Sequence, residues 1–164
     1  MAPTSAEFVA DAKRSVRRLE MRDSYMLSDP WWKAWQAGRF EEYPEPPAWP
    51  ALIREVTGRG VSVRRARIVS EPVSEYIRFE YATTAGIVTA GERVRWVPRR
   101  LAAGLALPGT DCWIVDGDRV LFTFYSGDGE VVGRELGGVE AVTLCLDAFE
   151  AAWAVGVDHQ DYRV

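Results

Sequence analysis

The sequence predicts a single domain of the α+β or mixed α/β class, with a mixed sheet flanked by helices. Its 164 residues suit one domain. Segments with helical periodicity alternate with short runs rich in Val, Ile, Phe and Tyr, and Asp-Gly turns separate the last of these runs. We expect an N-terminal helical region at 1–40, a Pro-rich connector at 41–50, and an α/β body with a C-terminal helix at 51–164.

The N-terminal region carries two helix signals. Thr4 or Ser5 can cap a first helix, and apolar residues follow at helical spacing: Phe8, Val9, Ala12, Val16 and Leu19. Apolar alternation between 16 and 26 leaves open a strand there instead. Asp29 can cap a second helix over 30–37, because Pro30 suits a first turn. Four prolines in 41–50 exclude a regular helix or an inner strand there.

The body alternates helices and strands before it ends in a meander. The pattern predicts a helix at 51–57, a strand at 61–69, a helix at 71–81, a strand at 93–97 and a loop at 99–109. Asp116-Gly117 and Asp128-Gly129 interrupt β-prone runs, so we expect three antiparallel strands between 111 and 136. A helix over 139–155 should pack across the sheet.

Composition narrows the functional classes. The net charge of −4 does not favour a generic nucleic-acid binder. No stretch approaches the roughly 20 apolar residues of a membrane helix, and the N-terminus lacks the pattern of a signal peptide, so we expect a cytoplasmic protein. Cys112 and Cys145 lack the spacing of a zinc or redox motif and are expected to be small buried hydrophobes. We predict neither a metal nor a cofactor.

Arginines are concentrated in two blocks that fall on predicted strands. Guanidinium forks suit carboxylates and phosphates, so we predict that four of them bind an anionic small molecule or a partner: Arg65, Arg67, Arg95 and Arg99. The alternative is structural, with Arg64 facing solvent while Arg65 and Arg67 form ion pairs with carboxylates of the segment that follows: Glu71, Glu75 or Glu80.

Two further clusters are candidate sites. Acid, base and cationic groups gather in one segment and could serve a small-molecule enzyme of secondary metabolism: Glu71, Glu75, Tyr76 and Arg78. A structural network with Arg95 or Arg99 is the alternative. Trp31, Trp32 and Trp35 can form core, a partner-binding hot spot or a platform for nucleobases. We retain Trp31 and Trp32 as candidate binding residues.

The segments ALIREVTGRGVSVRRARIV and TDCWIVDGDRVLF resemble half of a phospholipase D-type hydrolase. The resemblance implies a phospholipase D-like sheet in which Asp116 occupies the aspartate position of the motif. Gly109 and Asp111 stand where that family carries its histidine and lysine, and His159 is the one histidine in the sequence. The resemblance therefore implies the scaffold without the phosphodiesterase chemistry.

The segments SEPVSEYIRFEY, GERVRWVPR and LPGTDCWIVDGDRV resemble an uncharacterised family of actinobacterial proteins often found beside helix-turn-helix regulators. This implies a regulatory or accessory role and supplies no catalytic residues. We therefore expect a noncatalytic protein that binds a helix-turn-helix regulator or an anionic ligand. The alternatives are the enzyme above and direct DNA binding, and a homodimer is a further expectation.

Overall fold

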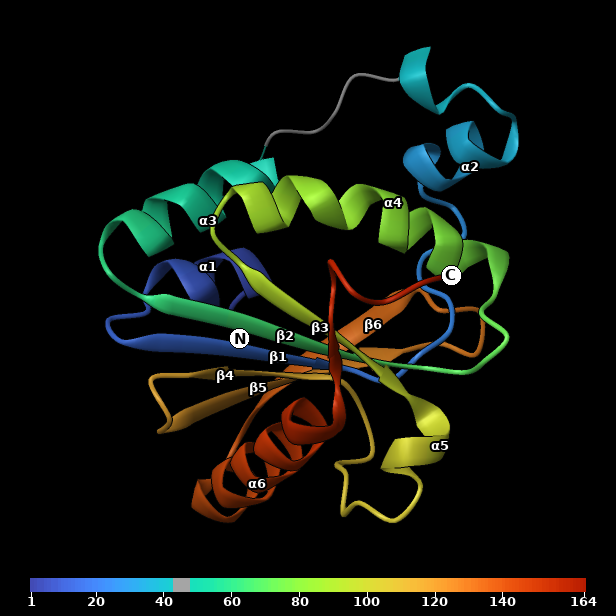
Figure 1. The fold of residues 1–164 in the computed structure, drawn as a ribbon. Coiled ribbons are helices and arrows are strands. Elements are labelled where there is room, and N and C mark those ends of the chain that lie inside the picture. The colour runs from blue at the N-terminus through green and yellow to red at the C-terminus, as the bar shows by residue number, and fades with distance from the viewer. Residues whose placement is uncertain (43–47) are drawn as a thin grey trace.

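The computed structural model describes residues 1–42 and 48–164, and in these ranges a seven-stranded mixed sheet lies between two layers of helices (Figure 1). The strand order is β6-β5-β4-β1-β2-β3-β7. β1, β2 and β3 are parallel, and the other neighbours pair antiparallel. The strands are β1 (Ser15–Glu20), β2 (Ser62–Val69), β3 (Arg93–Pro98), β4 (Cys112–Val115), β5 (Arg119–Tyr125), β6 (Val131–Gly137) and β7 (Val157–Asp158). The predicted mixed sheet with a C-terminal meander is confirmed.

The helices divide between the two faces of the sheet. α1, α3 and α4 cover one face, with α2 beyond the end of α4, and α5 and α6 lie on the other face (Figure 1). They are α1 (Ser5–Ala10), α2 (Pro30–Gln36), α3 (Ala48–Gly58), α4 (Glu75–Thr89), α5 (Arg99–Ala102) and α6 (Val139–Val155), and a short 3₁₀ helix, η1, spans Phe40–Glu42. Among the described residues no helix is both long and apolar enough to span a bilayer.

The prediction of a helical region at 1–40 is wrong in the middle of that range, where the chain forms β1, the central strand of the sheet. The carboxylate of Asp116 accepts hydrogen bonds from the backbone N–H groups of Lys13, Arg14 and Ser15. These N–H groups therefore do not continue α1. The alternation in 16–20 then suits a strand that pairs with β2 and β4.

Other elements also differ from the predictions. α3 begins at Ala48, inside the connector predicted at 41–50, because Pro50 lies in the first turn, where its missing N–H is not needed. Residues 43–47 of that connector lie outside the described residues. α4 spans Glu75–Thr89, so it begins and ends later than the helix predicted at 71–81, and α5 occupies part of the predicted loop at 99–109. β7 was not predicted, since two residues carry no periodicity.

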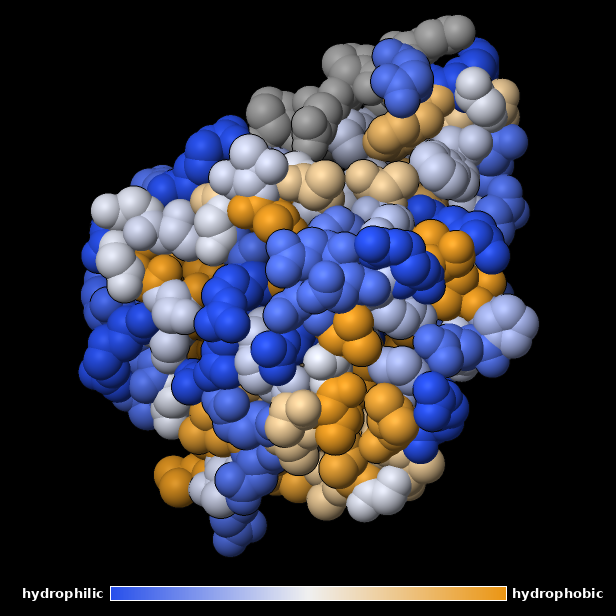
Figure 2. Space-filling model, viewed as in Figure 1, coloured by the Kyte–Doolittle hydropathy of each residue, from blue (hydrophilic) through white to orange (hydrophobic). Residues whose placement is uncertain are grey.

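The two faces of the sheet have different interiors. The face under α6 has one apolar cluster, which includes Leu19, Ile68 and Phe149. The opposite face has two: one around Ile53 and Trp113 under α1 and α3, and one around Trp32, Phe79 and Trp96 under α2 and α4. The outer surface is mixed, and Figure 2 shows hydrophobic residues gathered over the region of α5 and α6. A polar region separates the two clusters under α3 and α4.

Candidate functional site

Seven charged side chains form a buried ionic cluster on the face of the sheet that carries α3 and α4. None is more than 9% exposed, and they are Arg18, Glu20, Arg65, Arg67, Glu80, Glu92 and Asp111. Strand alternation brings them together. Arg18 and Glu20 of β1 share a face, and their register partners in β2 are Arg65 and Arg67. The charges therefore meet at the centre of the sheet.

Glu20 joins the three arginines of the cluster. Its Oε1 accepts hydrogen bonds from Arg65 Nη1 at 2.7 Å and from Arg18 Nε at 3.4 Å. Its Oε2 accepts one from Arg67 Nε at 2.7 Å. Burial raises the pKa of Glu20, but Arg67, Arg65 and Arg18 together outweigh burial and hold that pKa well below its ordinary value. Glu20 is therefore ionised in the folded protein.

The outer members of the cluster complete the pairing. Glu92 accepts from both Nε and Nη2 of Arg65. Asp111 accepts from Arg18 Nη2 at 3.2 Å, from the Tyr25 hydroxyl at 2.6 Å and from the Met21 N–H at 3.0 Å. Each guanidinium is thus bonded to at least one carboxylate, which buried charges require.

Glu80 of α4 is the least tightly held carboxylate of the cluster. Its Oε2 lies 3.8 Å from Arg67 Nε and has no hydrogen-bond partner in the described part of the chain. Burial, with a smaller contribution from the charge of Glu20, raises the pKa of Glu80 to about 7 against the attraction of Arg67. Near neutral pH this carboxyl group can therefore exchange a proton. Burial also raises the pKa of Asp111, against the attraction of Arg18, but Asp111 accepts three hydrogen bonds, whereas Glu80 Oε2 accepts none from a described residue.

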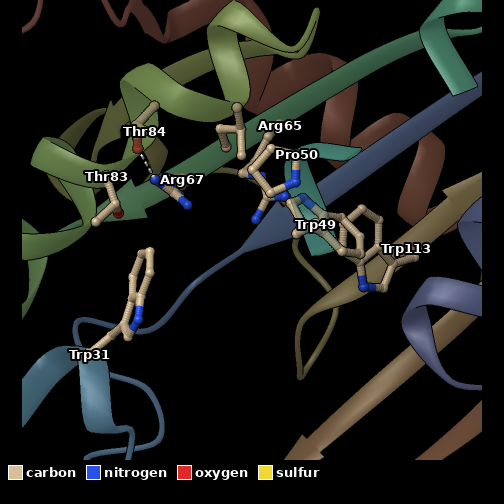
Figure 3. A pocket seen from close by; sticks show the side chains of 9 residues that line it. Trp31, Trp49, Pro50, Arg65, Arg67, Thr83, Thr84 and Trp113 are labelled. Atoms are coloured by element: carbon tan, nitrogen blue, oxygen red, sulfur yellow. Dashed lines mark hydrogen bonds between the residues drawn. The ribbon is translucent and has the colours of Figure 1, made fainter. Parts of the chain in front are cut away.

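A cavity of about 290 Å³ lies against the ionic cluster (Figure 3). Trp31 of α2 stands on one side of it, and Trp49 and Trp113 lie together on the other, with ring centroids 5.2 Å apart. Arg65 and Arg67 lie between these walls. The remaining lining residues are Pro50 and, from α4, Thr83, Thr84 and Ile87. The cavity thus combines indole surfaces with two guanidinium groups.

The cavity offers hydrogen-bond donors. Arg67 Nη1 donates to the Thr84 hydroxyl, whereas its Nη2 has no hydrogen bond to a described residue and points into the open space between the tryptophans (Figure 3). The buried Nε1 of Trp49 also has no partner in the described part of the chain. Both threonine hydroxyls donate to the Glu80 carbonyl oxygen of their own helix. A bound molecule would therefore need acceptor groups.

The four predicted arginines do not form one site. Arg65 and Arg67 line the cavity, but Arg95 lies on the opposite face of the sheet, because its register partner is Ala66. There Arg95 donates to Asp158 at 2.9 Å and to the Trp153 carbonyl oxygen. Arg99 begins α5 and donates to the Met21 carbonyl oxygen at 2.7 Å. The two arginine blocks are therefore separate.

The alternative prediction was that Arg65 and Arg67 form ion pairs with Glu71, Glu75 or Glu80 while Arg64 faces solvent. It is correct for Arg67 and wrong for the other two arginines. Arg67 does contact Glu80, but Arg65 pairs with Glu20 and Glu92 rather than with Glu71 or Glu75. Arg64 does not simply face solvent, since it bonds Glu150 of α6 at 2.6 Å. Sequence spacing favoured local partners, whereas the sheet supplies partners from other strands.

The residues of the alternative enzyme site are not brought together. Tyr76 is buried in the apolar cluster under α2 and α4, whereas Glu75 and Arg78 are exposed on α4. Glu71 lies outside the helix, where it accepts from the Tyr162 hydroxyl at 2.9 Å and pairs with Arg100 rather than with Arg95 or Arg99. The helix separates these groups because adjacent positions along it point in different directions.

The aromatic candidates have different environments. Trp32 is 5% exposed and packs against Tyr76 and Phe79 in the core. Trp31, in contrast, lines the cavity. The sequence interpretation missed Trp49 and Trp113 as site residues, together with four charged groups of the cluster: Arg18, Glu20, Glu92 and Asp111. The available signal was the charged alternation in SVRRLE, which resembles that of SVRRARIV.

No group of three or more His, Cys, Asp or Glu side chains in the described ranges is arranged to hold a metal ion. Cys112 and Cys145 are both buried and free of disulfides.

No curated protein matches the chain. Residues 3–164 match a family model described as a domain of unknown function, DUF6879. That match covers nearly the whole chain, so this protein belongs to the DUF6879 family.

Proposed function

We propose that this chain is a noncatalytic binding protein whose ligand is a small organic molecule with an acceptor group. The ligand occupies the cavity between Trp31 and the pair Trp49 and Trp113, and its acceptor lies on Arg67. The observation that carries the proposal is a donor nitrogen, Arg67 Nη2, that points into an indole-lined space (Figure 3).

The construction of the cavity supports binding rather than catalysis. Its volume of about 290 Å³ lies near the lower end of the roughly 300–1,000 Å³ of ligand pockets. None of the described lining residues is a His, Cys, Asp, Glu or Lys. The two threonine hydroxyls are bonded to the carbonyl of their own helix and have no adjacent base among the lining residues. The site therefore has recognition groups but no activated nucleophile.

The ionic cluster gives the cavity a rigid wall. Arg65 is bonded through three nitrogens to Glu20 and Glu92, and Arg67 is fixed through two nitrogens by Glu20 and Thr84. A guanidinium held in this way loses little conformational entropy when a ligand binds. This preorganisation supports selective recognition of a ligand that fits between the tryptophans.

The accessory or regulatory role, with a helix-turn-helix regulator as partner, stays a prediction that rests on family resemblance. The cytoplasmic location and a homodimer are also predictions. In this proposal the ligand is the signal that the regulatory role would need. Direct DNA binding through Arg65 and Arg67 is not proposed, because both side chains are buried and paired with carboxylates.

Quenching of tryptophan fluorescence by a panel of small aromatic acids and amides tests the proposal. Binding of at least one compound, weakened about tenfold or more in Trp31→Ala, is the expected result because that variant removes one stacking wall. Trp35→Ala is the matched control. Trp35 lies on α2 with Trp31, and both contact Phe40, but Trp35 does not line the cavity. Equal affinities of the two variants would contradict the proposal.

A further inference from the structure

We propose that the ligand of this cavity is a planar aromatic molecule with one negative charge, and that Glu80 takes up a proton when the ligand binds. The inference rests on the proposed function. It follows from the walls of the cavity, from the Arg67 nitrogen that has no hydrogen bond to a described residue, and from the balance of charge in the buried ionic cluster.

The walls favour a flat ring. Three indoles line a space of about 290 Å³, and the other apolar contacts are Pro50 and Ile87. Trp31 lies opposite Trp49 and Trp113 across this space (Figure 3). A ring placed between them gains stacking contacts on both faces, which stabilise an aromatic ligand beyond the burial of its surface.

The polar groups at the walls favour a negative charge on that ring. Of the seven charged groups in the ionic cluster, only the guanidiniums of Arg65 and Arg67 line the cavity, whereas the four carboxylates do not. Arg67 Nη2 supplies an N–H donor that points into the cavity (Figure 3). A carboxylate that accepts from Arg67 forms a charge-assisted bond, about twice as strong as a neutral one.

The net charge of the ionic cluster favours a ligand with a single negative charge. Its four carboxylates outnumber its three guanidiniums, so the fully ionised cluster has a net charge of −1. A bound monoanion would make the local charge −2, and a dianion would make it −3. Because excess charge of one sign is costly in a buried region, each added negative charge favours protonation of a carboxylate in the cluster.

Glu80 is the carboxylate placed to take that proton. Its Oε2 has no hydrogen-bond partner among the described residues, and it lies 3.8 Å from the arginine that would hold the ligand. The charged and titratable groups that act on Glu80, or on which Glu80 acts, come from several elements: Arg65 and Arg67 of β2, Glu20 of β1, Asp111, Tyr25, and Tyr76 of α4. Burial raises its pKa to about 7, so a nearby anion would shift it further upward through the physiological range.

The expected pH dependence has a definite sign. Below about pH 7 Glu80 carries its proton, so a monoanion binds without further proton uptake. Above about pH 7, binding must draw one proton from solution, and the affinity should then fall by up to about tenfold per pH unit. A neutral ligand of the same shape brings no charge, so its affinity should vary by less than about twofold.

The test uses the full chain and two probes of equal shape, naphthalene-2-carboxylate and its uncharged carboxamide. Calorimetric titration near pH 6 and pH 8 should give an affinity for the carboxylate that is lower at the higher pH by up to about tenfold. Near pH 8, titration in two buffers of different ionisation enthalpy should detect uptake of close to one proton per carboxylate. Glu80→Gln should abolish the pH dependence, and Glu75→Gln, an exposed residue of the same helix, should retain it.

The outcomes separate this inference from the proposed function. Carboxylate binding with the same affinity at both pH values, or without proton uptake, would overturn the inference and leave the binding function intact. Retention of the pH dependence in Glu80→Gln would also overturn the role of that residue. If neither probe nor any member of the aromatic panel binds, both proposals fail. The two-buffer calorimetry needs no variant, so the inference can be tested even if Glu80→Gln does not fold.

Discussion

Arg18 and Arg65 lie directly opposite each other in the parallel strands β1 and β2, with both guanidinium groups buried on the same face of the sheet. Two buried like charges in neighbouring strands destabilise the pairing unless an anion lies between them. Glu20 supplies that anion, since one of its oxygens is bonded to both arginines. Glu20 is therefore the carboxylate that these two arginines share, while Asp111 and Glu92 each pair with one of them.

Glu20→Gln should lower the free energy of unfolding by about 3–5 kcal/mol, because it leaves buried guanidiniums without their shared anion. The pKa of Glu20 is depressed in the folded state, so its contribution is present above the unfolded value of about 4.3 and is lost as pH falls further. Urea denaturation near pH 7 measures the loss. Glu55→Gln is the control, since Glu55 and Arg59 form an exposed pair worth at most about 1 kcal/mol. Similar losses in the two variants would contradict this account.

Glu80 should affect the pH dependence of stability in the opposite way to Glu20, because its pKa in the folded protein is raised rather than lowered. Burial raises the folded-state pKa of Glu80 to about 7, so the wild type loses stability between about pH 4.5 and pH 7 as this group ionises in the unfolded chain but not in the folded one. Glutamine has no such loss. The stability of the variant relative to wild type should therefore increase from about pH 5 to pH 8, by up to about 3 kcal/mol. Denaturation at both pH values checks this, and a constant difference would contradict it.

Asp116→Ala should destabilise the protein by about 2–3 kcal/mol, because three backbone N–H groups at the start of β1 lose a charged acceptor. Asp118→Ala, at an exposed position of the same hairpin, should cost less than about 1 kcal/mol. Thermal unfolding compares the two variants, and equal shifts would argue against the role of Asp116. This structural role explains the aspartate without catalysis, while the resemblance to a phospholipase D-type half stays a prediction.

Gly91→Ala should destabilise the protein more than Gly60→Ala. Both glycines have positive φ, at 113° and 86°, where a side chain is strained by about 1–2 kcal/mol. A Cβ at Gly91 would also lie 2.8 Å from the Thr57 hydroxyl oxygen, whereas a Cβ at Gly60 would meet nothing within 4 Å. Chemical denaturation of the two variants measures the difference. Equal losses would show that the contact with Thr57 is relieved at no cost.

The parts of the fold that were predictable from sequence are those specified by neighbouring residues. α6 spans Val139–Val155, as its periodicity predicts. The hairpin between β4 and β5 turns at Asp116 and Gly117, whose φ values are 56° and 79°, as the Asp-Gly signal indicates. β1 could not be predicted as firmly, because Val16 and Leu19 fit both helical spacing and a strand. Pairing with β2 and β4, which is not local, decides between them.

The candidate site was predictable only in part for the same reason. Arg65 and Arg67 stand out as a local block, but their buried partner Glu20 lies more than 40 residues earlier in the chain. Asp111 is 93 residues from Arg18. A sequence shows which residues are charged but not which strands are neighbours, so an arginine block and a neutralised ion-pair network look alike. The cavity likewise depends on tryptophans from three separate segments.

The two edges of the sheet differ in how they can be extended. β7 pairs with β3 through only two residues, and the segment after it turns back so that Tyr162 stacks on Trp96 with ring planes 11° apart. A short strand followed by a packed turn is a poor template for another strand. β6, at the other edge, is seven residues long and exposes Val132 and Leu136. A further strand, from a binding partner or from an aggregating copy of the chain, would therefore add at the β6 edge of the sheet rather than at the β7 edge.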